Sequence, residues 1–128
     1  MGYYTKYQLD VDPTGMIITV PLGELVTEVD LLTDSEKSRM VQKTVGVYEE
    51  VVKQLEVGYG NPFHEANKWY EHERDMKSIS RDFPAVVFTL SGIGEENSDM
   101  WVKYFKNGKV QVCRAKITFD KYNETELK

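Results

Sequence analysis

The chain has 128 residues, of which 41% are hydrophobic and 29% are charged, and its formal net charge is −5. A chain of this length can bury a core without disulfides or metal ions. Its apolar runs are far shorter than the ~20 residues that span a bilayer, and its acidity argues against a protein that coats nucleic acid. We expect one domain over residues 1–128, with residues 120–128 as a frayed tail.

The residues at the start of the chain show neither the basic nor the apolar segment of a secretory signal. The single cysteine, Cys113, cannot form an intramolecular disulfide, which is typical of a reducing compartment. Together these features favour the cytoplasm.

The first part of the chain predicts a hairpin. Alternating side chains favour a half-buried strand over residues 3–11, and residues 16–20 are consistent with a second short strand. Between them, residues 12–15 (DPTG) have turn chemistry, because proline presets φ and glycine accepts a positive φ. Residues 24–32 fit a connector, a short strand or a short helix.

Two long helices are predicted next. The first covers about residues 34–56, where apolar residues keep helical spacing behind a cap at Thr33 or Asp34. The second covers about residues 62–80, after the favourable start Asn61-Pro62. The residues expected to face inward on the second helix are Ala66, Trp69, Tyr70, Met76 and Ile79.

The last part of the chain predicts three strands. Residues 85–90 (AVVFTL) are apolar on both faces, as in a buried central strand. After an acidic loop over residues 92–99, residues 100–119 alternate around Asn107-Gly108, a pair that suits a type I′ hairpin turn. The order of elements predicts an α+β fold: an antiparallel sheet with two helices packed on one face, ferredoxin-like or a related sandwich.

The predicted hairpin at residues 100–119 holds five basic residues and no acidic one, inside an acidic chain. A two-residue turn sets a register in which Lys106 opposes Lys109 and Trp101 opposes Arg114. The side chains then divide between two faces. The small or aliphatic set, expected beneath the helices, is Met100, Val102, Cys113, Ala115 and Ile117. The aromatic and cationic set, expected to face outward, is Trp101, Lys103, Phe105, Val110, Val112 and Arg114.

The predicted hairpin is also the candidate binding site. Its partner-binding residues are expected to be Trp101, Lys103, Tyr104, Phe105, Lys106, Lys109 and Arg114. Aromatic rings and arginine are enriched where proteins recognise partners, and the same side chains could stack on bases and contact phosphates. A simpler interpretation is a Trp101–Arg114 cation–π pair on a sheet edge that lysines keep soluble. The acidity of the remaining chain favours a protein partner.

Other clusters predict no metal, no cofactor and no catalytic residue. His64 and His72 lie on one predicted helix ~12 Å apart, too far for one tetrahedral ion. The mid-strand position of Cys113 is typical of an inert buried thiol. An acidic surface that mimics nucleic acid is a further alternative, formed by Glu24, Glu28, Asp30, Glu95, Glu96 and Asp99.

Five segments resemble small accessory proteins encoded by bacteriophages and prophages: GYYTKY, WYEHERDM, FP, SGIGEENSD and WVKYFKNGKVQ. The resemblance covers the first strand and about residues 69–111. It implies a protein that acts in the bacterial host cytosol by binding a host or defence protein, as anti-CRISPR-like and other anti-defence inhibitors do. It carries no active-site residue over to this chain.

We therefore expect a non-enzymatic protein of phage type that binds a bacterial protein and inhibits or redirects it by steric occlusion. Two alternatives stay open. One is a nucleic-acid-binding module that uses the basic hairpin, and the other is a homodimer that binds a small ligand as a sponge.

Overall fold

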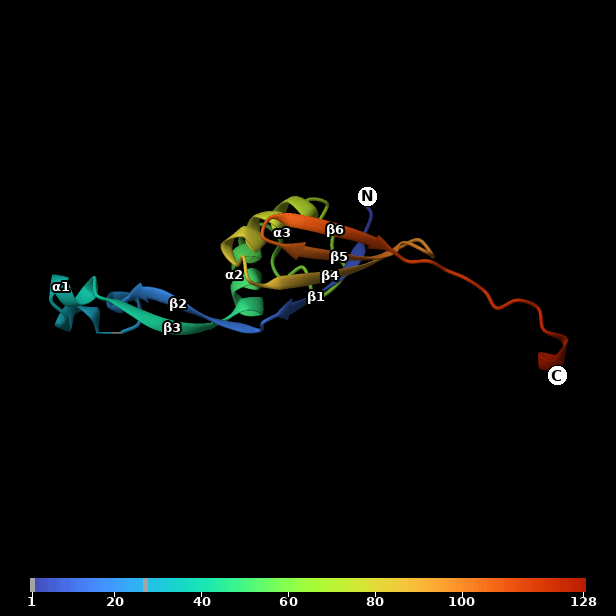
Figure 1. Ribbon diagram of the computed structural model, residues 1–128. Helices are drawn as coiled ribbons and strands as arrows, with labels where there is room; N and C mark the ends of the chain where they lie inside the picture. The colour runs from blue at the N-terminus through green and yellow to red at the C-terminus, as the bar shows by residue number, and fades with distance from the viewer. Residues whose placement is uncertain (1, 27) are drawn as a thin grey trace.

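The computed structural model describes residues 2–26 and 28–128, without the side chains of residues 29, 57 and 59 (Figure 1). Its body contains a sheet of four antiparallel strands in the order β1-β4-β5-β6. The strands are β1 (Thr5–Asp12), β4 (Val87–Gly94), β5 (Met100–Lys106) and β6 (Lys109–Arg114). The first strand therefore pairs with β4, which lies far along the chain.

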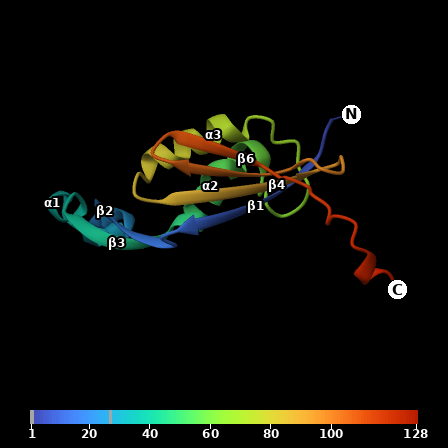
Figure 2. The same cartoon turned by 45° about the vertical axis from the view of Figure 1, so that its right-hand side comes forward.

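Two helices, α2 (Val47–Tyr59) and α3 (His72–Asp82), lie on one side of this sheet (Figures 1 and 2). The core between the two layers is formed by Tyr7, Leu9, Val47, Val51, Leu55, Trp69, Met76, Ile79, Phe83, Val86, Phe88, Leu90, Trp101 and Phe105. The expected α+β class, with an antiparallel sheet, is confirmed, and a ferredoxin-like arrangement stays a prediction. Among the described residues, no helix is long and apolar enough to cross a membrane.

A two-stranded ribbon projects from the body. It consists of β2 (Gly15–Pro21) and β3 (Met40–Gly46), which pair with each other in antiparallel fashion. The ribbon carries three short helices beyond its strands: η1 (Leu22–Glu24), η2 (Val29–Leu31) and α1 (Asp34–Lys37). Figures 1 and 2 show α1 at its far end. We call residues 15–46 the arm and residues 22–39 its tip.

The arm contradicts two predictions. The N-terminal hairpin is wrong, because β1 pairs with β4 and β2 pairs with β3. The long helix over residues 34–56 is also wrong: Thr33 does cap a helix, but α1 is only four residues long and β3 follows it. The segment MVQKTVG is rich in β-branched residues, which favour strands. Its apolar positions Val41 and Val45 are four residues apart, a spacing that puts them on one face of a helix or of a strand.

The predicted helix over residues 62–80 begins only at His72. The segment before it pairs with β1 instead, through two backbone hydrogen bonds of 2.9 Å between Thr5 and Asn67. Of the residues expected to face inward, Trp69, Met76 and Ile79 are buried, whereas Ala66 and Tyr70 are exposed.

The strands in the last part of the chain follow the predictions in order and register but not in their bounds, since β4 extends to Gly94, inside the loop expected over residues 92–99, and β6 ends at Arg114, before the end of the hairpin expected over residues 100–119. β4 overlaps the strand expected over residues 85–90. The hairpin has the predicted register, with Lys106 opposite Lys109 and Trp101 opposite Arg114. Asn107 and Gly108 both adopt positive φ, 47° and 79°, as a type I′ turn requires. Beyond β6, the Ala115 amide still donates to the Met100 carbonyl at 3.0 Å, and residues 116–128 then extend away from the body (Figure 1).

Candidate functional site

The aromatic and cationic residues of β5 point into the body. Trp101 is 8% exposed, Lys103 is 7% exposed and Phe105 is fully buried. The expected outward orientation of these three side chains is therefore wrong. The set expected beneath the helices is wrong in the same way, since Met100 is exposed and Cys113 is only half-buried.

The burial of Trp101 depends on its neighbours. Gly92 lies opposite it on β4, and a Cβ atom at Gly92 would collide with the indole ring. On the helix side the His72 ring stacks on the indole, with centroids 4.8 Å apart and an interplanar angle of 10°. The cation over the ring is Lys103, whose Nζ lies 4.4 Å from the ring centroid. Arg114, the cation expected there, is exposed on the edge strand β6.

Lys103 is the only charged side chain that is buried among the described residues. Its Nζ donates to Oε2 of Glu73 at 2.9 Å and to Nε2 of His72 at 2.7 Å. His72 can accept because its Nδ1 lies 2.9 Å from the Trp69 carbonyl oxygen, which only accepts, so Nδ1 carries the proton. The cluster thus joins α3 to β5 with its hydrogen bonds satisfied.

The surroundings shift two pKa values in this cluster. Burial lowers the pKa of His72 and the nearby Lys103 ammonium lowers it further, although the Trp69 carbonyl opposes both effects. The hydrogen bond from Lys103 lowers the pKa of Glu73. At neutral pH the histidine is therefore neutral and the glutamate is charged, as the contacts with the ammonium require.

The opposite face of the sheet is uncovered, because α2 and α3 both lie on the core side (Figure 2). The strand registers align its side chains in rows that run across all four strands. One row is Asp10, Thr89, Tyr104 and Gln111, and the next is Gln8, Ser91, Val102 and Cys113. This face is mixed in character, with one aromatic ring near its centre.

A shallow hollow of about 630 Å³ lies on this face beside the β5–β6 turn. Its lining includes Val87, Tyr104, Lys106, Lys109 and Gln111, which we call the open-face site. The Tyr104 ring and Val87 offer apolar surface, and the two lysines lie opposite each other at the turn. The site can therefore hold an apolar group beside a negative charge.

The structure divides the predicted partner-binding residues. Tyr104, Lys106 and Lys109 come together in the open-face site, whereas Trp101, Lys103 and Phe105 lie on the core side. Val87 and Gln111 are the additional residues that sequence reasoning missed. The alternation of β4 and β6 could have found them, because both project from the same side of the sheet as Tyr104.

The acidic residues of the alternative surface do not form one surface. Glu24, Glu28 and Asp30 belong to the arm tip, beyond the Asp12 end of β1. Glu95, Glu96 and Asp99 follow β4 at the other end of the sheet, where Gly94 pairs with Thr5. Asp99 also accepts a hydrogen bond of 2.6 Å from the Tyr3 hydroxyl, which raises the pKa of Tyr3.

In the described part of the chain, no three His, Cys, Asp or Glu side chains are grouped so that they could hold a metal ion. His72 instead accepts a hydrogen bond from Lys103. Cys113 lies on the open face opposite Val102, half-buried, rather than in the core as expected.

No protein-family model, no curated protein and no solved structure matches this chain. A function is therefore inferred from the geometry of the open-face site and the chemistry of its side chains.

Proposed function

We propose that this protein is a non-enzymatic binding protein that docks a partner protein on its open-face site. In keeping with the resemblance to phage accessory proteins, the partner is a bacterial host or defence protein, which docking inhibits or redirects by steric occlusion. The observation that carries the proposal is a whole sheet face left uncovered by both helices, with a hollow at Tyr104.

The chemistry of the site supports a protein partner with an acidic patch. Tyr104 is 41% exposed and sits on a central strand, so it offers a ring whose position the sheet fixes. Tyrosine is among the residues that contribute most to protein interfaces, because it buries a large area at low entropic cost. Lys106 and Lys109 beside it would attract an acidic surface and orient it during encounter.

The nucleic-acid alternative draws less support. Trp101 and Phe105, which were expected to stack on bases, are buried, so Tyr104 is the one aromatic ring of β5 that is free to stack. The small-ligand alternative relies on the same hollow. Pockets for drug-sized ligands typically enclose ~70–90% of the ligand surface, whereas this hollow lies on an open sheet face.

The proposal is tested by capture of partners from host lysate with the full-length protein. The variant Tyr104→Ala/Lys106→Glu/Lys109→Glu should retain less than about a tenth of the captured partner, because the ring and both cations contribute to docking. Quantitative mass spectrometry of the captured fraction gives the readout. Steep loss of bound single-stranded RNA with rising salt would favour the nucleic-acid alternative instead.

A control variant makes the same chemical changes elsewhere. Tyr122→Ala/Lys116→Glu/Lys121→Glu alters one tyrosine and two lysines of the exposed C-terminal segment. It should capture the partner as the unaltered chain does. Equal capture by the open-face variant and by the unaltered chain would show that another surface binds.

A further inference from the structure

The outer edge of β6 carries backbone groups that no other strand covers in the described part of the chain. β6 is the last strand of the body sheet, and among the described residues only β5 pairs with it (Figure 1). The Ala115 amide donates to the Met100 carbonyl, so the backbone of Ala115 faces β5. Because these directions alternate along an antiparallel strand, the N–H and C=O groups of Val110, Val112 and Arg114 point away from the sheet.

The other edge of the body sheet, β1, is partly covered and has the opposite charge. Thr5 of β1 already exchanges two backbone hydrogen bonds of 2.9 Å with Asn67. The sequence of β1, TKYQLDVD, has two acids and one lysine, whereas β6 carries Lys109 and Arg114 and no acid. β6 is therefore the open and cationic edge of the body.

The flank of α3 beside β6 adds two more cations. The Ser80 hydroxyl accepts a hydrogen bond of 2.8 Å from the Gly108 amide, and the Arg81 side chain lies against Gly108. Lys77 precedes Arg81 by one helical turn, so both lie on the same flank, where they line a hollow of about 280 Å³. A strand added outside β6 would lie ~4.8 Å beyond it and would turn one set of its side chains toward this flank.

The acids of α3 do not neutralise this flank. Glu73 lies on it, but its carboxylate already accepts from the Lys103 ammonium at 2.9 Å. Asp82 follows Arg81 in sequence, but consecutive helix residues point ~100° apart, so Asp82 projects from a different side of α3.

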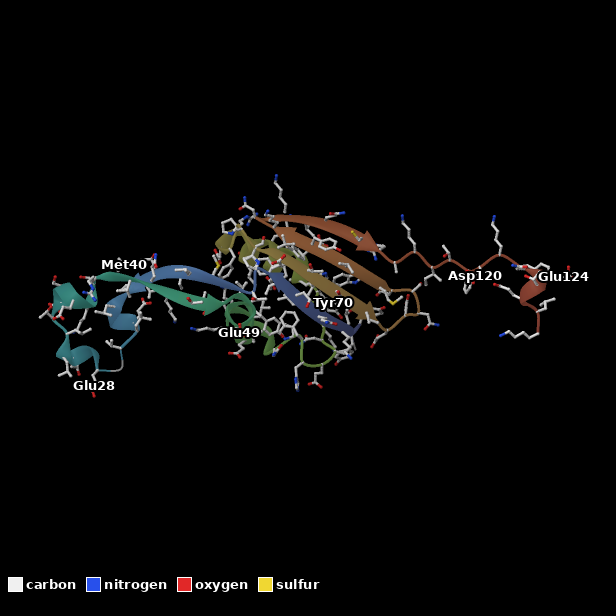
Figure 3. All side chains as sticks on the ribbon, turned by 60° about the horizontal axis from the view of Figure 1, so that its bottom comes forward. Glu28, Met40, Glu49, Tyr70, Asp120 and Glu124 are labelled. Atoms are coloured by element: carbon white, nitrogen blue, oxygen red, sulfur yellow. The ribbon has the colours of Figure 1, made fainter. Side chains whose placement is uncertain are left out.

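The other acids near β6 lie away from the end of the strand at the β5–β6 turn. The acidic loop over residues 95–99 leads into β5 at the far end of β6, beside Arg114. Figure 3 shows Asp120 and Glu124 on the C-terminal segment that extends away from the body. In the described part of the chain, neither Lys77 nor Arg81 forms an ion pair. The edge is therefore cationic at its turn end.

We propose that the β6 edge binds an extended acidic segment of another protein as a fifth strand of the body sheet. Each edge residue offers one donor and one acceptor, which a peptide backbone matches, whereas phosphates only accept and would leave the edge carbonyl groups unpaired. A second copy of β6 would bring its own cations against Lys109 and Arg114. Acidic side chains on the segment would instead reach Lys77 and Arg81.

The test uses the full-length protein and a fluorescent peptide of alternating threonine and glutamate as the probe. Fluorescence anisotropy should show that it binds about tenfold or more tightly than the same peptide with lysine in place of glutamate. In the complex, NMR should show the amides of Val110, Val112 and Arg114 exchanging with solvent about tenfold or more slowly. Binding without this protection would overturn the proposal.

The charge variant is Lys77→Glu/Arg81→Glu, which should weaken binding of the acidic peptide by about tenfold or more. The matched control, Lys53→Glu/Arg39→Glu, makes the same change in net charge at exposed positions on α2 and the arm tip. It should bind the peptide within about twofold of the unaltered chain, because distant charges are screened. Equal weakening by both variants, or no binding by the unaltered chain, would overturn the proposal.

A second variant tests the backbone. Val112→Pro removes an outward N–H group and no hydrogen bond to β5, and edge strands tolerate proline. It should weaken binding of the acidic peptide by about tenfold, whereas Val112→Thr, which keeps the donor, should not. The near-ultraviolet signal of the buried Trp69 and Trp101 reports an intact body, and the charge variant decides if the proline variant loses that signal.

The proposal does not rest on the open-face site. None of these substitutions alters Tyr104, Lys106 or Lys109, so peptide binding at the β6 edge and partner capture at the open face can fail independently. Tighter binding of oligothymidylate than of the acidic peptide would assign the cations to phosphate groups and overturn the proposal.

Discussion

The Lys103 ammonium is held between helix and sheet by two consecutive residues of α3, His72 and Glu73. A charge in this position is stabilising only while its partners remain, because an unpaired buried cation loses its hydration without compensation. The Trp101 ring completes its surroundings. Neighbouring acids of α3 should therefore differ greatly in their importance.

The variant Glu73→Ala should lower the free energy of unfolding by about 1–3 kcal/mol, because it removes the carboxylate that accepts from a buried donor. Glu71→Ala is the matched control. Glu71 pairs with Arg74 at 3.5 Å on the exposed surface, where such pairs contribute at most ~1 kcal/mol. Urea denaturation of both variants gives the comparison, and equal losses would contradict the role assigned to Glu73.

Stability should fall as the pH drops below the ordinary pKa of histidine, about 6.5. The folded protein holds the pKa of His72 below that value, so the unfolded chain binds the proton first and acid favours unfolding. The pKa of Glu73 is also lowered, so the free energy of unfolding continues to fall at more acidic pH, where this carboxylate is protonated.

His72→Gln should flatten the stability profile between neutral pH and the carboxyl range, since glutamine does not titrate. Thermal unfolding at a series of pH values measures the slope. His64→Gln, a change in the exposed loop before α3, serves as the control. An unchanged slope in His72→Gln would show that another group causes the acid sensitivity.

The sequence could not predict the burial of Lys103. Alternation along residues 100–106 correctly separates two sets of side chains, but it does not say which set a helix covers. Both sets contain apolar residues, and the partners that make Lys103 a core residue come from α3, far away in sequence. The exposure of Lys106 and Lys109 was predictable because they flank the hairpin turn, whereas the exposure of Tyr104, which lies on the same side as Val102, depends on that choice.

At the scale of elements, β4 has a glycine, Gly92, opposite Trp101 of β5, and this leaves room for the indole ring. Gly92→Ala should destabilise the protein by about 1–3 kcal/mol, because the added methyl group meets the Trp101 ring in a packed core. Gly58→Ala in α2 is the control, since a Cβ there meets nothing within 4 Å and alanine is the better helix former. Chemical denaturation should show opposite signs for the two changes.

Elements whose signals are local were predictable, and those decided by distant pairing were not. Asn107 and Gly108 set the hairpin register by themselves, since few other residues accept two consecutive positive φ angles. The segment MVQKTVG, in contrast, becomes a strand because β2 is available to pair with it. The spacing of its apolar residues fits either structure, so the sequence favoured one long helix where the chain has α1, β3 and α2.

For the whole molecule, hydrogen exchange should separate the arm from the body. Backbone amides of β2 should exchange about ten times faster than those of β4, because the arm is a lone two-stranded ribbon whereas β4 lies in the centre of the body sheet. Mass spectrometry of deuterated peptides measures both, and equal protection of the two strands would contradict the division into arm and body.

The α+β class followed from the order of strands and helices, but the division into body and arm did not. Composition does not change at residue 15 or residue 46, and apolar residues continue along both strands of the arm. Only the pairing of β1 with β4 shows that β2 lies outside the body sheet.

The arm leaves and re-enters the body at a single point, where the Val47 amide donates to the Thr14 carbonyl at 2.9 Å and Gly15 lies opposite Gly46. The arm is an insertion between β1 and α2, so it could be replaced without changing the order of the strands in the body sheet. By alternation from the Leu22–Arg39 hydrogen bond, Ile18 and Lys43 form a hydrogen-bonded pair, so a two-residue Asn-Gly link between them would close a shortened arm on the same body. Lengthening the arm by whole cross-strand pairs would instead move the tip outward, so the length of the arm can be changed without altering the body.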